Sequence, residues 1–134
     1  MALKLVIVTP EADVLQIECD EVVVPGVKGE IGILPGHVAL ITALRPGVLV
    51  ILSKGKKTYY AVNAGFAEVE EDTVTVLTDS SEEAAAIDVA RAKKALAEAE
   101  EQLQGLSPED SAFVDVRRRA DRAAARIDAA ARRA

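Results

Sequence analysis

The apolar pattern of this chain changes its period near Asp79, and that change limits the folds that it can adopt. Before this point the sequence consists of short segments rich in β-branched residues, bounded by turn signals such as Pro25-Gly26. After it, Ala, Glu, Lys and Arg dominate, and apolar residues recur at spacings of three and four, as on one face of a helix. We therefore expect two parts, a β domain over residues 1–80 and a helical arm over residues 81–134.

The expected strands of the first part are short and closely spaced. They cover residues 3–8, 22–24, 31–34, 38–44, 48–52, 58–62 and 73–77. Many short strands separated by turns favour an antiparallel β-sandwich over alternating strands and helices. Because the segment from Val48 to Leu52 is apolar throughout, we expect it to be buried on both faces or to lie at a partner surface.

The second part predicts an antiparallel hairpin of two helices. Ser80 and Glu83 form a capping-box pattern for a first helix that runs to about Gln104, and Ser107-Pro108 is typical of the start of a second helix. The apolar residues between the helices are mostly Ala, which buries little area, so their contact should be weak although each helix is intrinsically favoured. Two interpretations stay open: a static cap, or an arm that opens and packs elsewhere.

Composition argues against several classes of protein. The chain has one His and one Cys, which leaves no cysteine or histidine metal cluster and no internal disulfide. It has no Gly-rich phosphate loop and no nucleophile elbow, so we expect no catalytic residues and no metal site. The net charge of −6 argues against a general nucleic-acid binder. The first residues lack the features of a signal peptide, and no apolar run approaches ~20 residues.

Some polar residues have both a plain and a functional interpretation. His37, in a predicted tight turn, is either an exposed turn residue or a contact to a partner protein. Glu30, flanked by glycines, is either solvated or paired with a cation of a partner. A stripe of arginines on the second helix is either a solvated face or an anion site, since guanidinium groups suit phosphate and carboxylate; it comprises Arg119, Arg122, Arg126 and Arg133.

Four stretches, in this order, resemble the epsilon subunit of the bacterial F-type ATP synthase. They are residues 8–11 (VTPE), 29–37 (GEIGILPGH), 63–69 (NAGFAEV) followed by 74–77 (VTVL), and 87–92 (IDVARA). The resemblance covers essentially the whole chain. It implies a non-catalytic subunit that docks on the gamma subunit of the central stalk and on the ring of c subunits, at the cytoplasmic face of the bacterial inner membrane. It further implies a role in coupling proton flow to ATP formation.

In bacterial members of that family, the two-helix arm either lies against the sandwich or extends into the catalytic alpha/beta head, where it inhibits ATP hydrolysis. The resemblance therefore gives roles to several residues of this chain. Glu30 is expected to face the c ring and His37 to face gamma. Arg117, Arg118 and Arg119 are expected to pair with acidic groups of the head when the arm is extended.

The resemblance also implies a regulatory ATP site in the folded arm, with no other cofactor required. The family motif of Ile or Leu, Asp, two variable residues, Arg and Ala is complete here as Ile87, Asp88, Arg91 and Ala92. The second helix would add Arg122 and Arg126, and an acidic position before the motif is matched by Glu82. Glu98 is a departure, since it stands where phosphate-binding members carry an Arg, and an acid there would repel phosphate.

Two other classes of protein remain as alternatives. A free-standing ligand-binding β-sandwich with a helical cap would be a monomer with a deep apolar pocket. An arginine-helix nucleic-acid binder would show a steep salt dependence of binding, although the acidic first part opposes it. Co-purification with a membrane ATPase would separate the resemblance from both alternatives.

Overall fold

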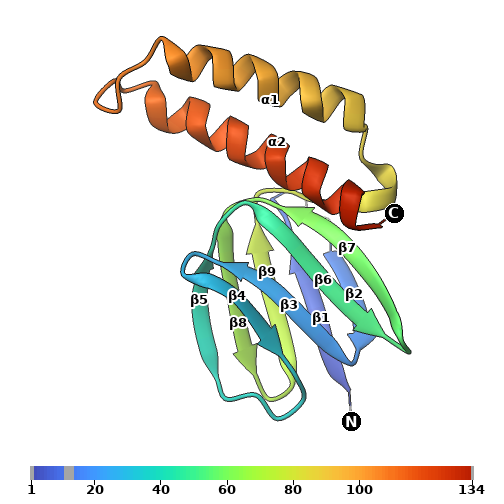
Figure 1. Ribbon diagram of the computed structural model, residues 1–134. Helices are drawn as coiled ribbons and strands as arrows, with labels where there is room; N and C mark the ends of the chain where they lie inside the picture. The colour runs from blue at the N-terminus through green and yellow to red at the C-terminus, as the bar shows by residue number, and fades with distance from the viewer. Residues whose placement is uncertain (1, 11–13, 134) are drawn as a thin grey trace.

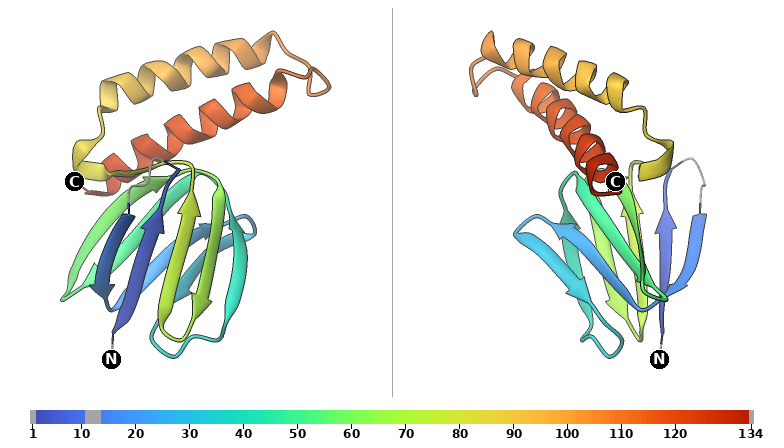
Figure 2. Two further views of the ribbon diagram at one scale, coloured as in Figure 1. Left: turned by 180° about the vertical axis from the view of Figure 1, so that it is seen from behind. Right: turned by 45° about the vertical axis from the view of Figure 1, so that its right-hand side comes forward.

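A curled β-sheet and a hairpin of two helices make up the chain. The computed structural model describes residues 2–10 and 14–133. The sheet lies on one side and the helices α1 (Val89–Gln104) and α2 (Phe113–Arg133) on the other, with α2 between α1 and the sheet (Figures 1 and 2). The expected fold class, a β-sandwich followed by a two-helix hairpin, is confirmed.

The sheet contains ten strands within the described residues. They are β1 (Leu3–Val8), β2 (Val14–Cys19), β3 (Glu21–Gly26), β4 (Gly29–Ile33), β5 (Leu40–Leu44), β6 (Gly47–Ser53), β7 (Lys56–Val62), β8 (Gly65–Glu70), β9 (Thr73–Thr78) and β10 (Ser81–Glu83). Their order is β10-β7-β6-β3-β5-β8-β9-β1-β2, and β4 pairs with β3. Each pair is antiparallel except β1 with β9, which is parallel. The sandwich is therefore antiparallel, as expected, except at this pair, where no tight turn links the two strands and fixes their relative direction.

Three of these strands, β2, β8 and β10, were not among the strands expected from the sequence. In β8, Ala67 and Val69 are buried, whereas Phe66 and Glu68 are exposed. A small Ala at an inward position made this alternation hard to recognise. The strand starts at Gly65, where an added Cβ would collide with the Leu77 carbonyl oxygen, so the close approach of β8 to β9 requires glycine there.

The sandwich core is aliphatic, and β6 is buried on both of its faces. Leu49 and Ile51 point into the core between the curled layers. Val48 and Val50 point the other way and pack in a second cluster with Ala129 of α2. Of the two alternatives expected for this apolar segment, the structure shows burial on both faces, because α2 covers the face of β6 that a simple sandwich would leave in water.

The first helix begins later than the capping-box pattern indicated. Ser81–Glu83 instead forms β10 along the free edge of β7, and Ala84–Ala86 forms a 3-10 turn, η1. The helix α1 begins at Val89, where the Asp88 carboxylate accepts a hydrogen bond from the Arg91 backbone at 3.1 Å. The unpaired backbone groups of the β7 edge outweigh the local preference for a helix.

The second helix also begins later than expected. Residues 107–110 form a turn in which the Asp110 carboxylate accepts from the Ser107 backbone N–H at 2.8 Å, and α2 starts at Phe113. The Asp side chain stabilises the turn conformation locally, in competition with the helix.

The arm is held to the sheet through α2 and the linker before α1. The two helices meet along a seam of small residues that includes Ala92, Ala99, Val116 and Ala120. The C-terminal half of α2 rests on β6, β7 and η1, whereas the tip of the hairpin projects beyond the sheet (Figures 1 and 2). Docking of the arm therefore depends on the C-terminal half of α2 and on the linker before α1.

Candidate functional site

A pocket of about 640 Å³ lies where both helices meet β7 and β10. We call it the arm pocket. Its lining residues come from β7, from the linker around β10 and from facing positions of the two helices: Ala61, Val62, Ser80, Ser81, Glu82, Arg91, Ala95, Glu98, Ala99, Gln102, Arg119, Arg122, Ala123 and Arg126. Because its walls come from the sheet and from both helices, this pocket exists only while the arm is docked.

The structure brings four of the seven residues expected at a nucleotide site to this pocket. They are Glu82, Arg91, Arg122 and Arg126. The other three are outside its lining: Ile87 is buried under α2, Ala92 is buried between the helices, and Asp88 caps α1. Glu98, the residue that departs from the family pattern, also lines the pocket.

The lining of the arm pocket carries a net positive charge, which favours an anion. Its lining contains four arginines and two glutamates. Arg126 is already partnered, since its Nε donates to Glu82 Oε1 at 2.8 Å and its Nη2 lies 3.5 Å from Oε2. Arg91, Arg119 and Arg122 are exposed, and within the described residues their side chains form no ion pair. An anion in this pocket would therefore meet three arginines that have no carboxylate partner.

The three consecutive arginines near the start of α2 differ in their surroundings. Arg117 pairs with Asp121 on its own helix, with 3.3 Å between Nε and Oδ1. Arg119 lines the arm pocket, and Arg118 lines a neighbouring pocket against the ends of the strands. All three are exposed, so the docked arm leaves them accessible.

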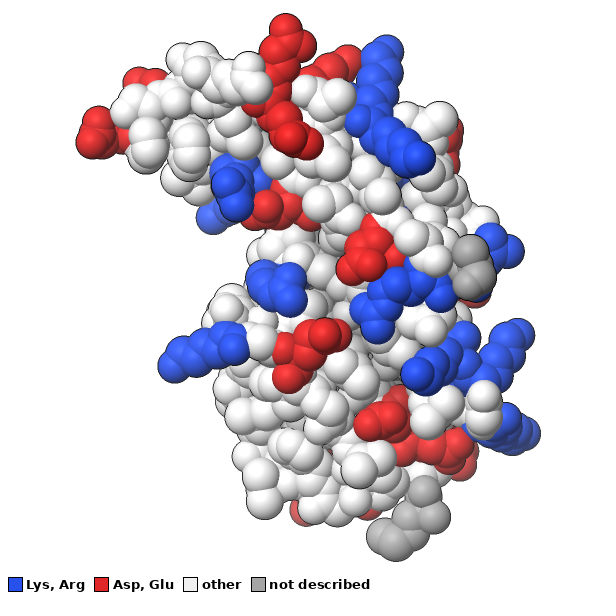
Figure 3. All heavy atoms as spheres, in the orientation of Figure 1, with Lys and Arg blue, Asp and Glu red and all other residues white. Residues whose placement is uncertain are grey.

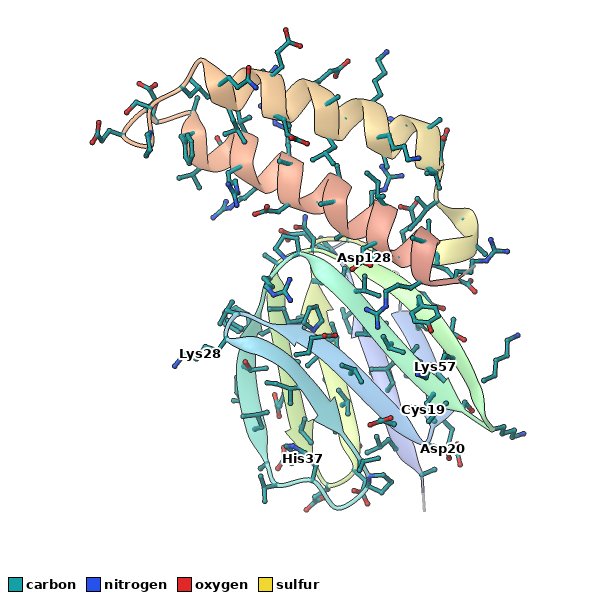
Figure 4. The ribbon with its side chains drawn as sticks, in the orientation of Figure 1. Cys19, Asp20, Lys28, His37, Lys57 and Asp128 are labelled. Atoms are coloured by element: carbon teal, nitrogen blue, oxygen red, sulfur yellow. The ribbon has the colours of Figure 1, made fainter. Side chains whose placement is uncertain are left out.

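Glu30 and His37 lie at opposite ends of β4 rather than together. Glu30 is exposed and stands opposite Pro25 in the ladder, next to the turn that contains Lys28. His37 follows the other end of the strand, as the separation of Lys28 and His37 in Figure 4 shows. Two separate contacts, rather than one combined site, fit this placement.

The loop that carries His37 is held by a residue from another hairpin. The Gly36 backbone N–H donates to Asp72 Oδ1 at 2.7 Å, and His37 Nδ1 donates to the Val38 carbonyl at 2.7 Å. Leu34 and Val38 are 56% and 75% exposed, so two large apolar side chains flank the loop in water. In Figure 3 the sheet surface over β4 and β5 is mostly uncharged. An exposed apolar loop of fixed shape is typical of a protein contact.

Three further features bear on what the chain can do, namely its metal-binding side chains, its single cysteine and the polarity of its helices. Within residues 2–10 and 14–133, no group of three His, Cys, Asp or Glu side chains is placed to hold a metal ion. Cys19 is buried, and burial, with smaller contributions from Asp20 and Glu18, raises the pKa of its thiol. Across the same described ranges, the helices are too short or too polar to cross a membrane.

Sequence reasoning left Arg119 out of the expected nucleotide site and did not assign Gln102 to any site. Arg119 was placed on the arginine stripe that was a candidate anion site, and it was also expected to contact a partner. Its position three residues before Arg122 on that stripe was the signal that linked it to the same pocket. Gln102 carries no comparable signal, because only the packing of α1 against α2 points it into the pocket.

Comparison with known proteins decides the family. A family model described as the β-sandwich domain of the ATP synthase delta/epsilon chain matches residues 2–84. The ATP synthase epsilon chain of Geotalea uraniireducens is 46% identical over 132 residues, covering 98% of this chain and 96% of the relative. The chain belongs to the ATP synthase epsilon chain family. As a member it is a non-catalytic subunit of ATP synthase, which confirms that expectation.

Other members of the epsilon family agree over nearly the full length. The epsilon chain of Myxococcus xanthus is 42% identical, covering 92% of this chain and 91% of the relative. A chain of the Euglena gracilis mitochondrial ATP synthase superposes with a TM-score of 0.82 at 25% identity, covering 97% of this chain and 81% of that chain. A chain of the Tetrahymena thermophila enzyme, 12% identical with a TM-score of 0.62 and 97% of each chain covered, shares the fold. The epsilon family relationship therefore includes the arm as well as the sandwich.

Proposed function

We propose that this chain is a central-stalk subunit of a bacterial F-type ATP synthase, bound at the cytoplasmic face of the inner membrane. It contacts gamma and the ring of c subunits, couples proton flow to ATP formation, and inhibits ATP hydrolysis when its arm extends into the alpha/beta head. The observation that carries the proposal is the full-length relationship to epsilon chains, together with an arm that is docked mainly through the end of α2 and the linker before α1. The separate exposed sites at Glu30 and around His37 support contacts to two partners.

The docking interface supports an arm that can change position. It consists of a small apolar cluster that includes Ala129, Val48 and Val50, one ion pair, and the Arg132 guanidinium 5.3 Å from the centre of the Tyr59 ring. Burial of a few small side chains contributes only a few kcal/mol at ~25 cal/mol per Å². Two packings that differ by so little can exchange, and a ligand or partner that favours one of them shifts the population.

Reconstitution with an epsilon-depleted catalytic head tests the regulatory part. ATP hydrolysis is measured with the full chain and with a chain that ends at Ile87, which keeps β10 and the residues packed beside it. We expect the full chain to inhibit and the shortened chain to bind without inhibiting. Equal hydrolysis with both chains would contradict inhibition by the arm, whereas failure of both to bind would contradict the stalk assignment.

We further propose that ATP binds in the arm pocket and holds the arm docked. The convergence of Arg91, Arg119 and Arg122 beside the Glu82–Arg126 pair supports this site. Guanidinium groups bind phosphate through paired N–H donors. Glu98 in the same lining opposes a phosphate, so the affinity should be modest. Asp88 is occupied as a helix cap, so recognition of the adenine by its carboxylate is not required by this proposal.

Calorimetric titration of the chain with ATP tests the site in two directions. Arg122→Ala should weaken binding, because it removes a cation from the pocket. Glu98→Gln should tighten it, because it removes a like charge while keeping the size of the side chain. The absence of any heat of binding at millimolar ATP would contradict the proposal. Unchanged affinity in both variants would place the nucleotide elsewhere.

A further inference from the structure

A second pocket, of about 600 Å³, lies beside the arm pocket and has a different character. We call it the strand-end pocket. One wall is α2, and the others are the C-terminal ends of β1 and β9 with the turn between β7 and β8. Its lining includes Val8, Gly65, Phe66, Leu77, Arg118 and Arg119. In the left view of Figure 2, this is where α2 passes over the upper ends of β1, β8 and β9.

The sheet side of the strand-end pocket borders an apolar row that crosses four strands. The ladder places Ala43 opposite Phe66, Phe66 opposite Leu77, and Leu77 opposite Val8. Residues paired in register share a face of the sheet. Phe66 is 56% exposed and Leu77 is 50% exposed, so this side of the pocket presents an aromatic ring and an aliphatic chain to water.

The helix side of the pocket is basic. Arg118, Arg119 and Arg122 line it, and Asp79 is the one acidic residue of the lining among the residues that the structure describes. Within the described part of the chain, none of these three guanidinium groups forms an ion pair. The neighbouring Arg117, in contrast, is neutralised by Asp121 and does not line the pocket. Cationic donors therefore face an apolar wall across one cavity.

The floor of the pocket is rigid enough to keep this geometry. The Thr78 hydroxyl accepts from the Asn63 backbone N–H at 3.1 Å and donates to the Asn63 carbonyl at 3.0 Å. The Ala64 backbone N–H donates to Asn63 Oδ1 at 2.9 Å. These bonds fix the turn between β7 and β8, so a ligand would meet a preformed wall.

From this arrangement we propose that the strand-end pocket binds a small organic anion, a phosphate or carboxylate attached to a ring or a short alkyl chain. The anionic group pairs with Arg118 and Arg119, and the apolar part covers Phe66 and Leu77. A cavity of this size is in the range that small ligands occupy. Because α2 and the sheet each supply a wall, the ligand binds only the docked arm and stabilises it by mass action. The two pockets share Arg119 and Arg122, but Arg118 lines only the strand-end pocket, whereas Arg91 and Arg126 line only the arm pocket. Variants at these three positions therefore distinguish this site from the nucleotide proposal.

Titration of the ¹⁵N-labelled full chain with phenyl phosphate, followed by NMR, tests the proposal. We expect saturable shifts of the Gly65 and Phe66 amides. Arg118→Gln should weaken binding about fivefold, the effect of losing one exposed ion pair. Arg117→Gln, its matched neighbour, should leave binding unchanged. Inorganic phosphate should bind more weakly than phenyl phosphate, and Phe66→Ser should reduce phenyl phosphate to the level of inorganic phosphate.

Three results would overturn the proposal. The first is shifts that do not saturate. The second is equal affinity in the wild type and in Arg118→Gln. Because the side chains of Arg117 and Arg118 are both exposed, neither variant should disturb the fold, so a change in affinity can be assigned to the lost cation. The third is shifts confined to Ser81 and Ala95 and lost in Arg126→Gln, which would assign the anion to the arm pocket.

Discussion

The Nε atom of Arg126 lies 2.8 Å from Oε1 of Glu82, and this pair joins α2 to β10 across 44 residues of sequence. The side chains are 22% and 36% exposed, so the pair lies at the edge of the docked interface rather than in bulk water. Among the described residues, it is the one salt bridge that joins the arm to the sheet. Its strength therefore contributes directly to the docked state.

A double-mutant cycle should detect this contribution. We expect Glu82→Gln and Arg126→Gln to show a coupling of up to about 1 kcal/mol in the free energy of unfolding, as for partly exposed pairs. Urea unfolding of the two single variants and the double variant measures it. The pair Arg117–Asp121, within one helix, serves as the control, with about 0.3–0.5 kcal/mol expected. A coupling of zero at Glu82–Arg126 would show that this ion pair does not stabilise docking, which would then depend on apolar packing and on the Arg132–Tyr59 contact.

The β domain should fold without the arm. A chain ending at Ser80 should keep a cooperative thermal transition, because the main core lies between strands β1 to β9. It should be less stable than a chain ending at Ile87, since β10 covers the β7 edge and Ala84 and Ile87 pack beside Val48. Calorimetry compares the two. A molten or insoluble shorter chain would place the domain boundary after β10.

Reversing the charge of Glu30 should affect assembly and not folding. Glu30→Lys is expected to weaken binding to the stalk and c ring, while the free energy of unfolding changes by within ~0.5 kcal/mol because the side chain is exposed. Binding to an epsilon-depleted synthase and urea unfolding measure the two effects. Glu70→Lys, at an exposed site on β8, is the control. Parallel losses of folding and binding would show a structural role for Glu30.

The arginine cluster of α2 should act when the arm extends. Replacing Arg117, Arg118 and Arg119 with Ala should relieve inhibition of ATP hydrolysis, because their charges would pair with acidic groups of the catalytic head. Steady-state hydrolysis of the reconstituted head measures it. Replacement of Lys93, Lys94 and Arg133, three exposed cations outside the cluster, controls for the change in net charge. Full inhibition by the triple variant would point to packing by Phe113 and Ile127.

Stability should fall at alkaline pH, in part through Cys19. Burial raises the pKa of this thiol above its ordinary 9.0 in the folded state, and burial and Glu83 raise the pKa of Tyr60 above 10.0. As the pH rises past 9.0, the unfolded chain loses the thiol proton before the folded chain does, so the free energy of unfolding decreases. Cys19→Ala should flatten this decrease between pH 8 and about 10, whatever its effect at neutral pH. An unchanged slope would contradict the shift.

Local sequence determined much of the fold because its signals act over a few residues. The division into a β part and a helical part, the two-sided burial of β6 and the small residues between the helices follow from periodicity and composition. The family resemblance rested on contiguous motifs such as residues 29–37, and it was confirmed. The grouping of Glu82, Arg91, Arg122 and Arg126 at one pocket was also anticipated.

The tertiary structure decided what depends on distant partners. Ser81–Glu83 has a helix-start pattern, yet it forms a strand because β7 offers an unpaired edge to it. β1 lies parallel to β9 although 64 residues separate Val8 from Thr73, and no local pattern encodes that pairing. Because α1 begins at Val89, Asp88 is the cap of that helix. Arg118 faces Phe66 and Leu77 across the strand-end pocket, although these residues are distant in sequence. The sequence alone determined which residues could form the two pockets. The docking of α2 on the sheet decided which of them meet, because contacts between distant segments depend on how whole elements pack.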